Sequence, residues 1–237
     1  MVAGADDTSA PKPPVDIVLA MTDEWAQPER VDEYLRREIP HRDFAEAMLA
    51  AALPERVERF ADLGCGDGRL IALVRERFPA AAAVGLDSSP TMLARAMERF
   101  AGEDGVELVE ADLAEPLSAA IGGAPSGLSA MGEQLDLVVS GLAIHHLEDE
   151  RKRSLLAELA TLLRPGGVFA NLDLVRAATP QLHERFRREI GRVEDDPSDR
   201  LADLTEQLQW LCDAGFTAVE CHFKWLELSL VVAEKPA

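Results

Sequence analysis

Basic side chains are scarce in this chain. Its 237 residues carry 24 Lys and Arg against 43 Asp and Glu, which gives a net charge of -19 at pH 7. A protein that binds the phosphate backbone of DNA or RNA needs a basic surface to neutralise that backbone. The charge balance therefore argues against a nucleic acid as a partner.

Cysteines and long apolar runs are also few. The three cysteines, Cys65, Cys212 and Cys221, have neither the spacing of metal ligands nor the even count of a disulfide framework. No apolar run approaches the roughly 20 residues of a membrane-spanning helix. The start, 1–7, is acidic where a secretory signal would be basic. We expect a reduced, cytoplasmic protein with no membrane partner and no metal site.

Strand and helix patterns alternate regularly from residue 57 onward, and hydrophobic residues make up 47% of the chain, enough to bury a full α/β core. This alternation predicts a parallel sheet with right-handed crossovers. After a last helix, two strands follow with too short a connection for a crossover, so they must form an antiparallel hairpin. The expected strands are 57–63, 82–86, 106–110, 135–140, 168–174, 217–224 and 227–233, and the expected helices are 69–78, 90–100, 148–163 and 201–214.

Three other segments frame this pattern. Residues 1–20, rich in Pro, Ala and Asp, predict a disordered tail, and 21–54 predict a helical cap in two pieces broken at Pro40. We assign 55–237 to the main domain, in which the glycine-rich stretch 114–133 is expected to be a surface loop. The charged stretch 176–200, with a helix at about 181–192, is a candidate substrate lid, because long insertions after a strand are often lids. A solvated charged helix is the alternative.

The most informative segment is Phe60-Ala-Asp-Leu-Gly-Cys-Gly-Asp-Gly-Arg69. An apolar strand leads into the three alternating glycines, and an amphipathic helix follows at once. Glycine allows positive φ and lets a ligand lie against the backbone, and a helix start offers unpaired N–H groups and the positive end of a dipole. Asp62 adds a carboxylate beside the turn. The segment predicts a small-molecule cofactor site.

The spacing of the glycines discriminates between cofactors. A dinucleotide fingerprint, Gly-x-Gly-x-x-Gly, would need glycine at position 69, which is Arg69. The segment Asp62-x-Gly-x-Gly-x-Gly68 instead resembles motif I of the class I S-adenosylmethionine-dependent methyltransferases, and the final helix and hairpin are similar to the end of that family's sheet. The resemblance runs from about Trp25 to Glu234. It implies an α/β, Rossmann-like three-layer sandwich whose seven-stranded, mostly parallel sheet has one antiparallel strand.

The resemblance also implies S-adenosylmethionine as cofactor, S-adenosylhomocysteine as product, and specific contacts. Asp87 would accept the ribose hydroxyls, although it could instead cap the helix that begins at Pro90. Asp112 would accept the adenine amino group, with Glu110 as a competitor. The remaining contacts that the resemblance implies involve Arg42, Gly64, Cys65, Gly66, Ser88, Met92, Leu113 and Ser140. Met92 could instead pack in the core, and Arg42 could instead lie on the surface.

Two adjacent histidines follow the fourth expected strand. Ligands bind beyond the carboxyl ends of strands in open α/β sheets, and histidine is a suitable general base near neutral pH. We expect His145 to face the substrate and His146 to pack beside it, with a structural role for both as the alternative. Asp173, which ends the fifth strand, is a further inward-facing candidate. The run Ser140-Gly-Leu-Ala lacks the prolines of nucleic-acid amino-methyltransferases, which disfavours base methylation.

These observations predict a methyltransferase that acts on a small molecule by in-line methyl transfer, as a monomer or homodimer. A non-catalytic or differently reacting S-adenosylmethionine-binding protein is the first alternative. A NAD-dependent oxidoreductase is the second, and the glycine spacing argues against it. The substrate and the methylated atom stay open, because the fold alone does not decide them.

Overall fold

The computed structural model of the chain describes residues 39–118 and 134–237. The predicted tail, the first piece of the helical cap with Trp25 and Tyr34, and most of the predicted loop at 114–133 lie outside the described residues. In the part of the chain that the structure describes, no helix combines the length and apolarity needed to cross a membrane.

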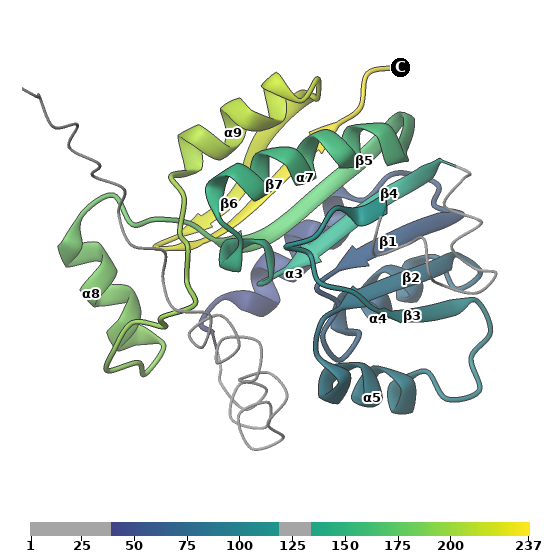
Figure 1. Cartoon of the computed structure of the whole chain (residues 1–237), viewed down its shortest axis with the longest axis horizontal. Coiled ribbons are helices and arrows are strands. Elements are labelled where there is room, and N and C mark those ends of the chain that lie inside the picture. The colour runs from purple at the N-terminus through teal and green to yellow at the C-terminus, as the bar shows by residue number, and fades with distance from the viewer. Residues whose placement is uncertain (1–38, 119–133) are drawn as a thin grey trace, which may run out of the picture.

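The strands form one seven-stranded sheet in the order β3-β2-β1-β4-β5-β7-β6 (Figure 1). All pairs are parallel except those of β7, which runs antiparallel to both β5 and β6. This confirms the expected mostly parallel sheet with one reversed strand. The strands are β1 Arg59–Leu63, β2 Ala82–Asp87, β3 Val106–Glu110, β4 Leu135–Gly141, β5 Leu163–Leu174, β6 Thr217–Trp225 and β7 Leu228–Glu234.

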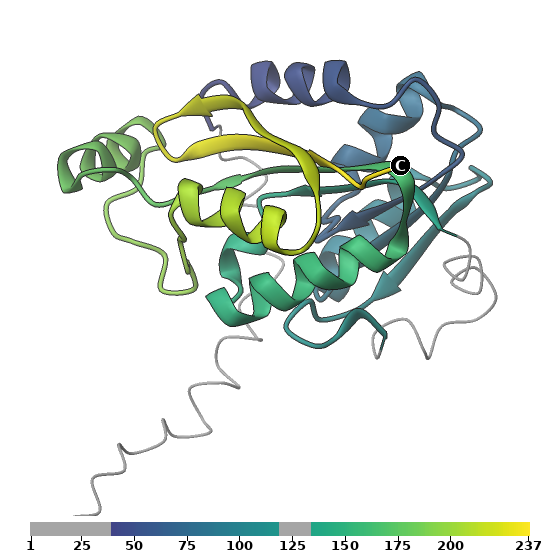
Figure 2. The same ribbon diagram turned by 90° about the horizontal axis from the view of Figure 1, so that it is seen from above.

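Helices cover both faces of the sheet, which gives the three layers (Figure 2). The first three described helices pack on one face, and α7 and α9 pack on the other. A short 3₁₀ turn, η3, follows β4. The helical elements are α3 Arg42–Ala52, α4 Arg69–Arg77, α5 Pro90–Arg99, η3 Ile144–His146, α7 Asp149–Leu162, α8 Pro180–Glu189 and α9 Leu204–Asp213.

The apolar runs of the central strands are explained by this double covering. Along β5, Val168, Ala170 and Leu172 belong to the core under α3 and α4, and Phe169 belongs to the core under α7 and α9. Successive side chains of a strand point to opposite faces, so a strand buried on both sides has no polar alternation.

Strand β5 begins at Leu163, earlier than the expected start at residue 168. The stretch Arg164-Pro-Gly-Gly was expected to separate helix from strand, yet it pairs on both sides. Leu163 pairs with Leu135 of β4, and Lys235 exchanges backbone hydrogen bonds with Gly166 and Gly167. A register shift between Leu135 and Leu137 accommodates the irregular glycines, which is why local sequence alone suggests a turn here.

Candidate cofactor-binding site

The glycine turn connects β1 to α4, and its three glycines all have positive φ: 66° at Gly64, 53° at Gly66 and 81° at Gly68. A Cβ at Gly64 would lie 2.2 Å from Ala143 Cβ, and one at Gly68 would lie 2.4 Å from the Phe100 ring. At Gly66 the nearest atom is Met92 Sδ at 4.0 Å. Two glycines therefore permit close packing, while the middle one leaves space beside the turn.

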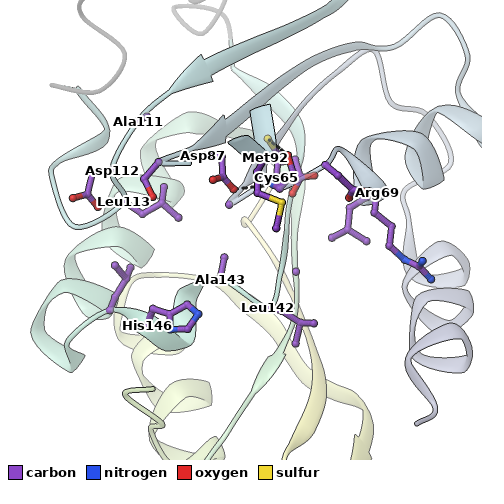
Figure 3. A pocket seen from close by; sticks show the side chains of 18 of the residues that line it. Cys65, Arg69, Asp87, Met92, Ala111, Asp112, Leu113, Leu142, Ala143 and His146 are labelled. Carbon is purple, nitrogen blue, oxygen red and sulfur yellow. Dashed lines mark hydrogen bonds between the residues drawn. The ribbon is translucent and has the colours of Figure 1, made fainter. Parts of the chain in front are cut away.

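That space belongs to a cavity of about 680 Å³ at the carboxyl ends of β1, β2, β3 and β4 (Figure 3). It lies where the strand order reverses between β1 and β4, the point at which open α/β sheets bind ligands. The predicted site residues that line it are Arg42, Asp62, Gly64, Cys65, Gly66, Asp87, Ser88, Met92, Asp112, Leu113 and His146.

Asp87 ends β2 and holds the glycine turn. Its Oδ2 accepts the Gly66 N–H at 2.8 Å, and its Oδ1 accepts the Ser89 N–H at 2.8 Å. The cap of α5 is Ser89, whose Oγ accepts the Met92 N–H at 3.2 Å, so Asp87 does not serve as that cap. Burial raises the pKa of Asp87, and the hydrogen bonds from Ser89 and Gly66 partly oppose this shift. Each carboxylate oxygen keeps a second lone pair, as the predicted contact with ribose hydroxyls requires.

Asp62 is buried at the end of β1, and neither of its oxygens has a hydrogen-bond partner of good geometry. Burial, and then the charge of Asp87, raise its pKa to about 8, and the Ile71 backbone N–H opposes this shift. A buried carboxylate is stable as an anion only beside a cation or hydrogen-bond donors. The ammonium of an amino-acid ligand would supply both, so this side chain fits the methionine part of S-adenosylmethionine.

Arg42 reaches the cavity wall from α3, and its Nε donates to Glu46 at 2.8 Å. The same Glu46 accepts two bonds from Arg69, at 2.6 and 2.7 Å, and Asp43 accepts another at 2.9 Å. Burial would raise the pKa of Glu46, but Arg69 and Arg42 lower it. Arg69, which occupies the place of the third dinucleotide glycine, thus ties α4 to α3. The predicted pairing of Arg42 with a cofactor carboxylate stays a prediction.

The sequence left two acids, Asp112 and Glu110, as candidates for contact with the adenine amino group. Asp112 follows β3, and its Oδ1 accepts the Ala114 N–H at 2.8 Å, which closes the turn after the strand. Glu110 also lines the cavity, so both acids stay available for the adenine amino group. Met92 is buried in the fold and lines the cavity as well, so its contact with adenine stays a prediction beside its role in the core.

Ser140 was expected to contact the cofactor through its backbone, and this contact stays a prediction. Its side chain is fully buried within the sheet, where Oγ donates to the Leu63 carbonyl at 2.8 Å, and it does not line the cavity. The next residue, Gly141, does. A Cβ on Gly141 would lie 2.9 Å from Leu70 Cδ1, so the close approach of α4 demands glycine at the strand end.

The two histidines have the reverse of the expected orientation. His146 lines the cavity, whereas His145 is buried behind it in the η3 turn. Asp173, at the end of β5, binds His145 through both carboxylate oxygens. Its Oδ2 accepts the backbone N–H of His145 at 2.9 Å, and its Oδ1 lies 2.5 Å from the ring nitrogen Nδ1. The expectation that His145 faces the substrate was therefore wrong, because an acid 28 residues away in sequence binds it.

The two imidazoles also differ in charge. Burial would lower the pKa of His145, but Asp173 and Asp199 raise it to about 9, so the ring is an imidazolium at neutral pH. Burial and the neighbouring His145 charge lower the pKa of His146 to about 4, so that ring is neutral.

One set of possible metal donors occurs among the described residues. Atoms of His145, His146 and Asp199 lie within 4.8 Å of one another. Neither the sequence spacing nor the motif had suggested them as a group, since Asp199 comes from the segment before α9. The expectation of no metal stays a prediction.

The sheet order, the reversed strand β7, the glycine turn and the acids at successive strand ends together define a class I S-adenosylmethionine-dependent methyltransferase fold. A family described as "Methyltransferase domain" matches residues 61–169. Trans-aconitate 2-methyltransferase of Escherichia coli (strain ATCC 8739) is 38% identical over 128 residues, which are 53% of this chain and 43% of that protein. An uncharacterized methyltransferase of Mycobacterium bovis is 35% identical over 137 residues, 58% of this chain and 59% of that protein.

Among solved structures, human N-acetylserotonin methyltransferase in complex with S-adenosylmethionine superposes with a TM-score of 0.64 at 16% identity, covering 92% of this chain and 59% of that one. Residues 61–169 thus match a methyltransferase domain family, and the sheet has the fold of S-adenosylmethionine-dependent methyltransferases. The chain spans less than half of the length of the trans-aconitate 2-methyltransferases that it matches.

Cofactor binding should be linked to the protonation of Asp62. Its raised pKa, about 8, means that the free protein holds a proton there at pH 7. A bound ammonium favours the carboxylate, so S-adenosylhomocysteine should release this proton and bind more tightly as the pH rises from about 6 to 8. Calorimetry in buffers of different ionisation enthalpy measures the release, with Asp62→Asn as the control. Equal proton release by both proteins would contradict the assignment.

Alanine at two of the glycines should have different effects. Gly68→Ala should lower the free energy of unfolding by about 2–3 kcal/mol, since its Cβ meets Phe100. Gly66→Ala should cost stability only through its positive φ, about 1 kcal/mol, but should weaken S-adenosylhomocysteine binding at least about tenfold, because the methyl group occupies the cofactor space. Urea denaturation and calorimetry separate the two. Similar losses of affinity and stability at both sites would contradict this difference.

Proposed function

We propose that this chain transfers the methyl group of S-adenosylmethionine to a small molecule. One observation carries the proposal: a single cavity extends from the glycine turn and its carboxylates to a second wall formed by Leu142, Ala143, His146 and Ser198. Its volume, about 680 Å³, is in the range of small-molecule sites. The first wall suits the cofactor, and the second leaves room for a methyl acceptor.

The protein's contribution to the reaction would be mainly orientation. The cofactor supplies a methyl group on a good leaving group, a sulfonium. The Gly66 turn, Asp62 and Asp87 would hold the cofactor in place, and the apolar side chains of Leu142 and Leu147 would exclude water. Holding an acceptor atom in line with the bond that breaks can account for a large part of a rate enhancement.

His146 is the candidate for contact with the acceptor. Its Nδ1 lies 3.3 Å from the Ser198 carbonyl and 3.1 Å from Ser198 Oγ, which itself donates to Asp196 Oδ1 at 2.7 Å. This network assigns the proton to Nδ1 and leaves Nε2 as an acceptor. With its lowered pKa the ring is a weak base, so it is better suited to orient a hydroxyl or amine than to store its proton.

The charge of the cavity bears on the class of acceptor. Within the described residues, Asp62, Asp67, Asp87, Glu110 and Asp112 contribute carboxylates to the wall, and the guanidinium groups there pair with acids of α3. These carboxylates belong to the cofactor wall, and among the described residues the acceptor wall of Leu142, Ala143, His146 and Ser198 adds no cationic side chain that would attract a polyanion. We therefore propose a neutral or cationic acceptor and do not carry trans-aconitate over from the matched relatives.

The remaining parts of the proposal rest on composition. The acidic net charge of -19 supports a protein that binds neither nucleic acid nor an anionic membrane surface. We propose a cytoplasmic monomer or homodimer. The alternative of a non-catalytic S-adenosylmethionine-binding protein shares the cofactor wall and differs only in turnover.

Two measurements test the function. Calorimetry should show binding of S-adenosylhomocysteine and none of NAD, because Arg69, which is bound to Glu46, stands at the position where a dinucleotide site needs glycine. Methyl-labelled S-adenosylmethionine with a panel of neutral and cationic hydroxyl and amine compounds should then yield a labelled product. Binding of NAD in place of S-adenosylhomocysteine would overturn the proposal.

With an acceptor in hand, His146→Ala should lower kcat/KM about 10- to 100-fold, because the acceptor loses its orienting partner. The affinity for S-adenosylhomocysteine should stay within about twofold, since His146 lies on the other wall. His222→Ala, an exposed histidine on β6, is the matched control. Unchanged turnover in His146→Ala would exclude the assigned contact.

A further inference from the structure

Two histidines connect the body of the domain to one acidic loop. The 193–203 loop links α8 to α9 beside the end of β4 (Figure 1). His145 lies between Asp173 of β5, at 2.5 Å, and Asp199 of the loop, at 3.4 Å. His183 of α8 lies between Glu227, which precedes β7, at 2.6 Å, and Asp195 of the loop, at 2.8 Å.

The two bridges share one construction. In each, the acid on the body is buried, with only 3% of the side chain exposed for both Asp173 and Glu227. Each imidazole presents one nitrogen to that acid and the other to an acid of the loop. His183 hydrogen-bonds both of its acids, whereas Nε2 of His145 faces Asp199 Oδ1 in an ion pair without a hydrogen bond. An imidazolium in this place compensates the buried carboxylate and attracts the second one.

The electrostatics of the two bridges agree with this geometry. Burial would lower the pKa of His145, but its two acids raise it. The pKa of His183 is raised chiefly by its hydrogen bond to Glu227. On the loop side, Asp199 is 15% exposed whereas Asp195 is 64% exposed, so water screens the His145–Asp199 ion pair less than the His183–Asp195 pair.

The His145 bridge determines where the loop meets the cavity. Arg200 N donates to the His145 carbonyl at 2.9 Å, and the buried Lys152 ammonium holds the Arg200 carbonyl. Arg192 binds the other oxygen of Asp199 at 3.1 Å. Between these fixed points, Ser198 reaches the cavity wall and contacts His146.

We propose that His145 and His183 are positioning residues that hold the 193–203 loop over the acceptor end of the cavity through two carboxylate–histidine–carboxylate bridges. The bridges fix Ser198 against His146 and so form one side of the acceptor pocket. Their role in acceptor binding rests on the proposed methyl transfer, whereas their role in holding the loop does not.

Neutral substitutions on the loop test the bridges without opening the core. Asp199→Asn and Asp195→Asn each remove one loop charge, and Glu194→Gln, an exposed acid of the same loop, is the matched control. Amide hydrogen exchange over 193–203 should become about tenfold faster in Asp199→Asn, less so in Asp195→Asn, and fastest in the double variant. Unchanged exchange in the double variant would overturn the proposal.

Two further readouts separate positioning from a general loss of structure. S-adenosylhomocysteine affinity should stay within about twofold, because the loop contacts the acceptor wall only. Once an acceptor is known, its KM should rise about tenfold in Asp199→Asn with kcat changed less, and Asp199→Glu should restore part of the loss. A change confined to kcat would overturn the role in acceptor binding. If no acceptor is found, the exchange result still decides whether the bridges hold the loop.

Metal analysis of the purified protein addresses the other role that His145, His146 and Asp199 could have. The bridges predict no stoichiometric metal, because both His145 nitrogens already face carboxylates. One equivalent of zinc in the wild type that is lost in Asp199→Asn would assign these atoms to a metal site and overturn the bridge.

Discussion

A carboxylate buried at the end of a parallel strand needs a partner, and this requirement organises the site. β1, β2 and β5 each carry an aspartate as their last or second-last residue, Asp62, Asp87 and Asp173. Asp87 is satisfied by backbone N–H groups of the glycine turn and of the cap before α5. Asp173 is satisfied by His145. Of these three aspartates, Asp62 alone has no partner of good geometry, and it lines the cavity together with Asp87.

These aspartates explain why much of the fold and the cofactor wall could be predicted from sequence. The strand ends and the turn are local features: an apolar run, a carboxylate, then glycine or a capping residue within a few positions. Arg69 was also informative locally, as a departure from the dinucleotide spacing. Its actual partner, Glu46, lies on another helix, and nothing in the spacing of either residue indicates the contact.

The acceptor wall could not be predicted in the same way, because its contacts join segments distant in sequence. The orientation of the histidine pair depends on Asp173, and the position of Ser198 depends on Asp199 and Lys152. The run Glu194-Asp-Asp-Pro-Ser-Asp199 has no periodicity and resembles a solvated acidic turn. Its proposed function as a wall depends on His145 and His183, whose pKa values are raised by acids that only the folded protein brings beside them.

The position of these contacts also limits what the relatives say about the acceptor. The family match covers 61–169, which contains the glycine turn, Asp87, Asp112 and the histidine pair. Of the acceptor wall, Leu142, Ala143 and His146 lie inside this match, whereas Ser198 lies outside it. A domain can therefore keep the cofactor wall while the segments before β1 and after β5 change the charge and shape of the acceptor pocket. Since Ser198 and the loop that carries it lie outside the match, the acceptor chemistry of this chain has to be inferred from these segments and not from the relatives' names.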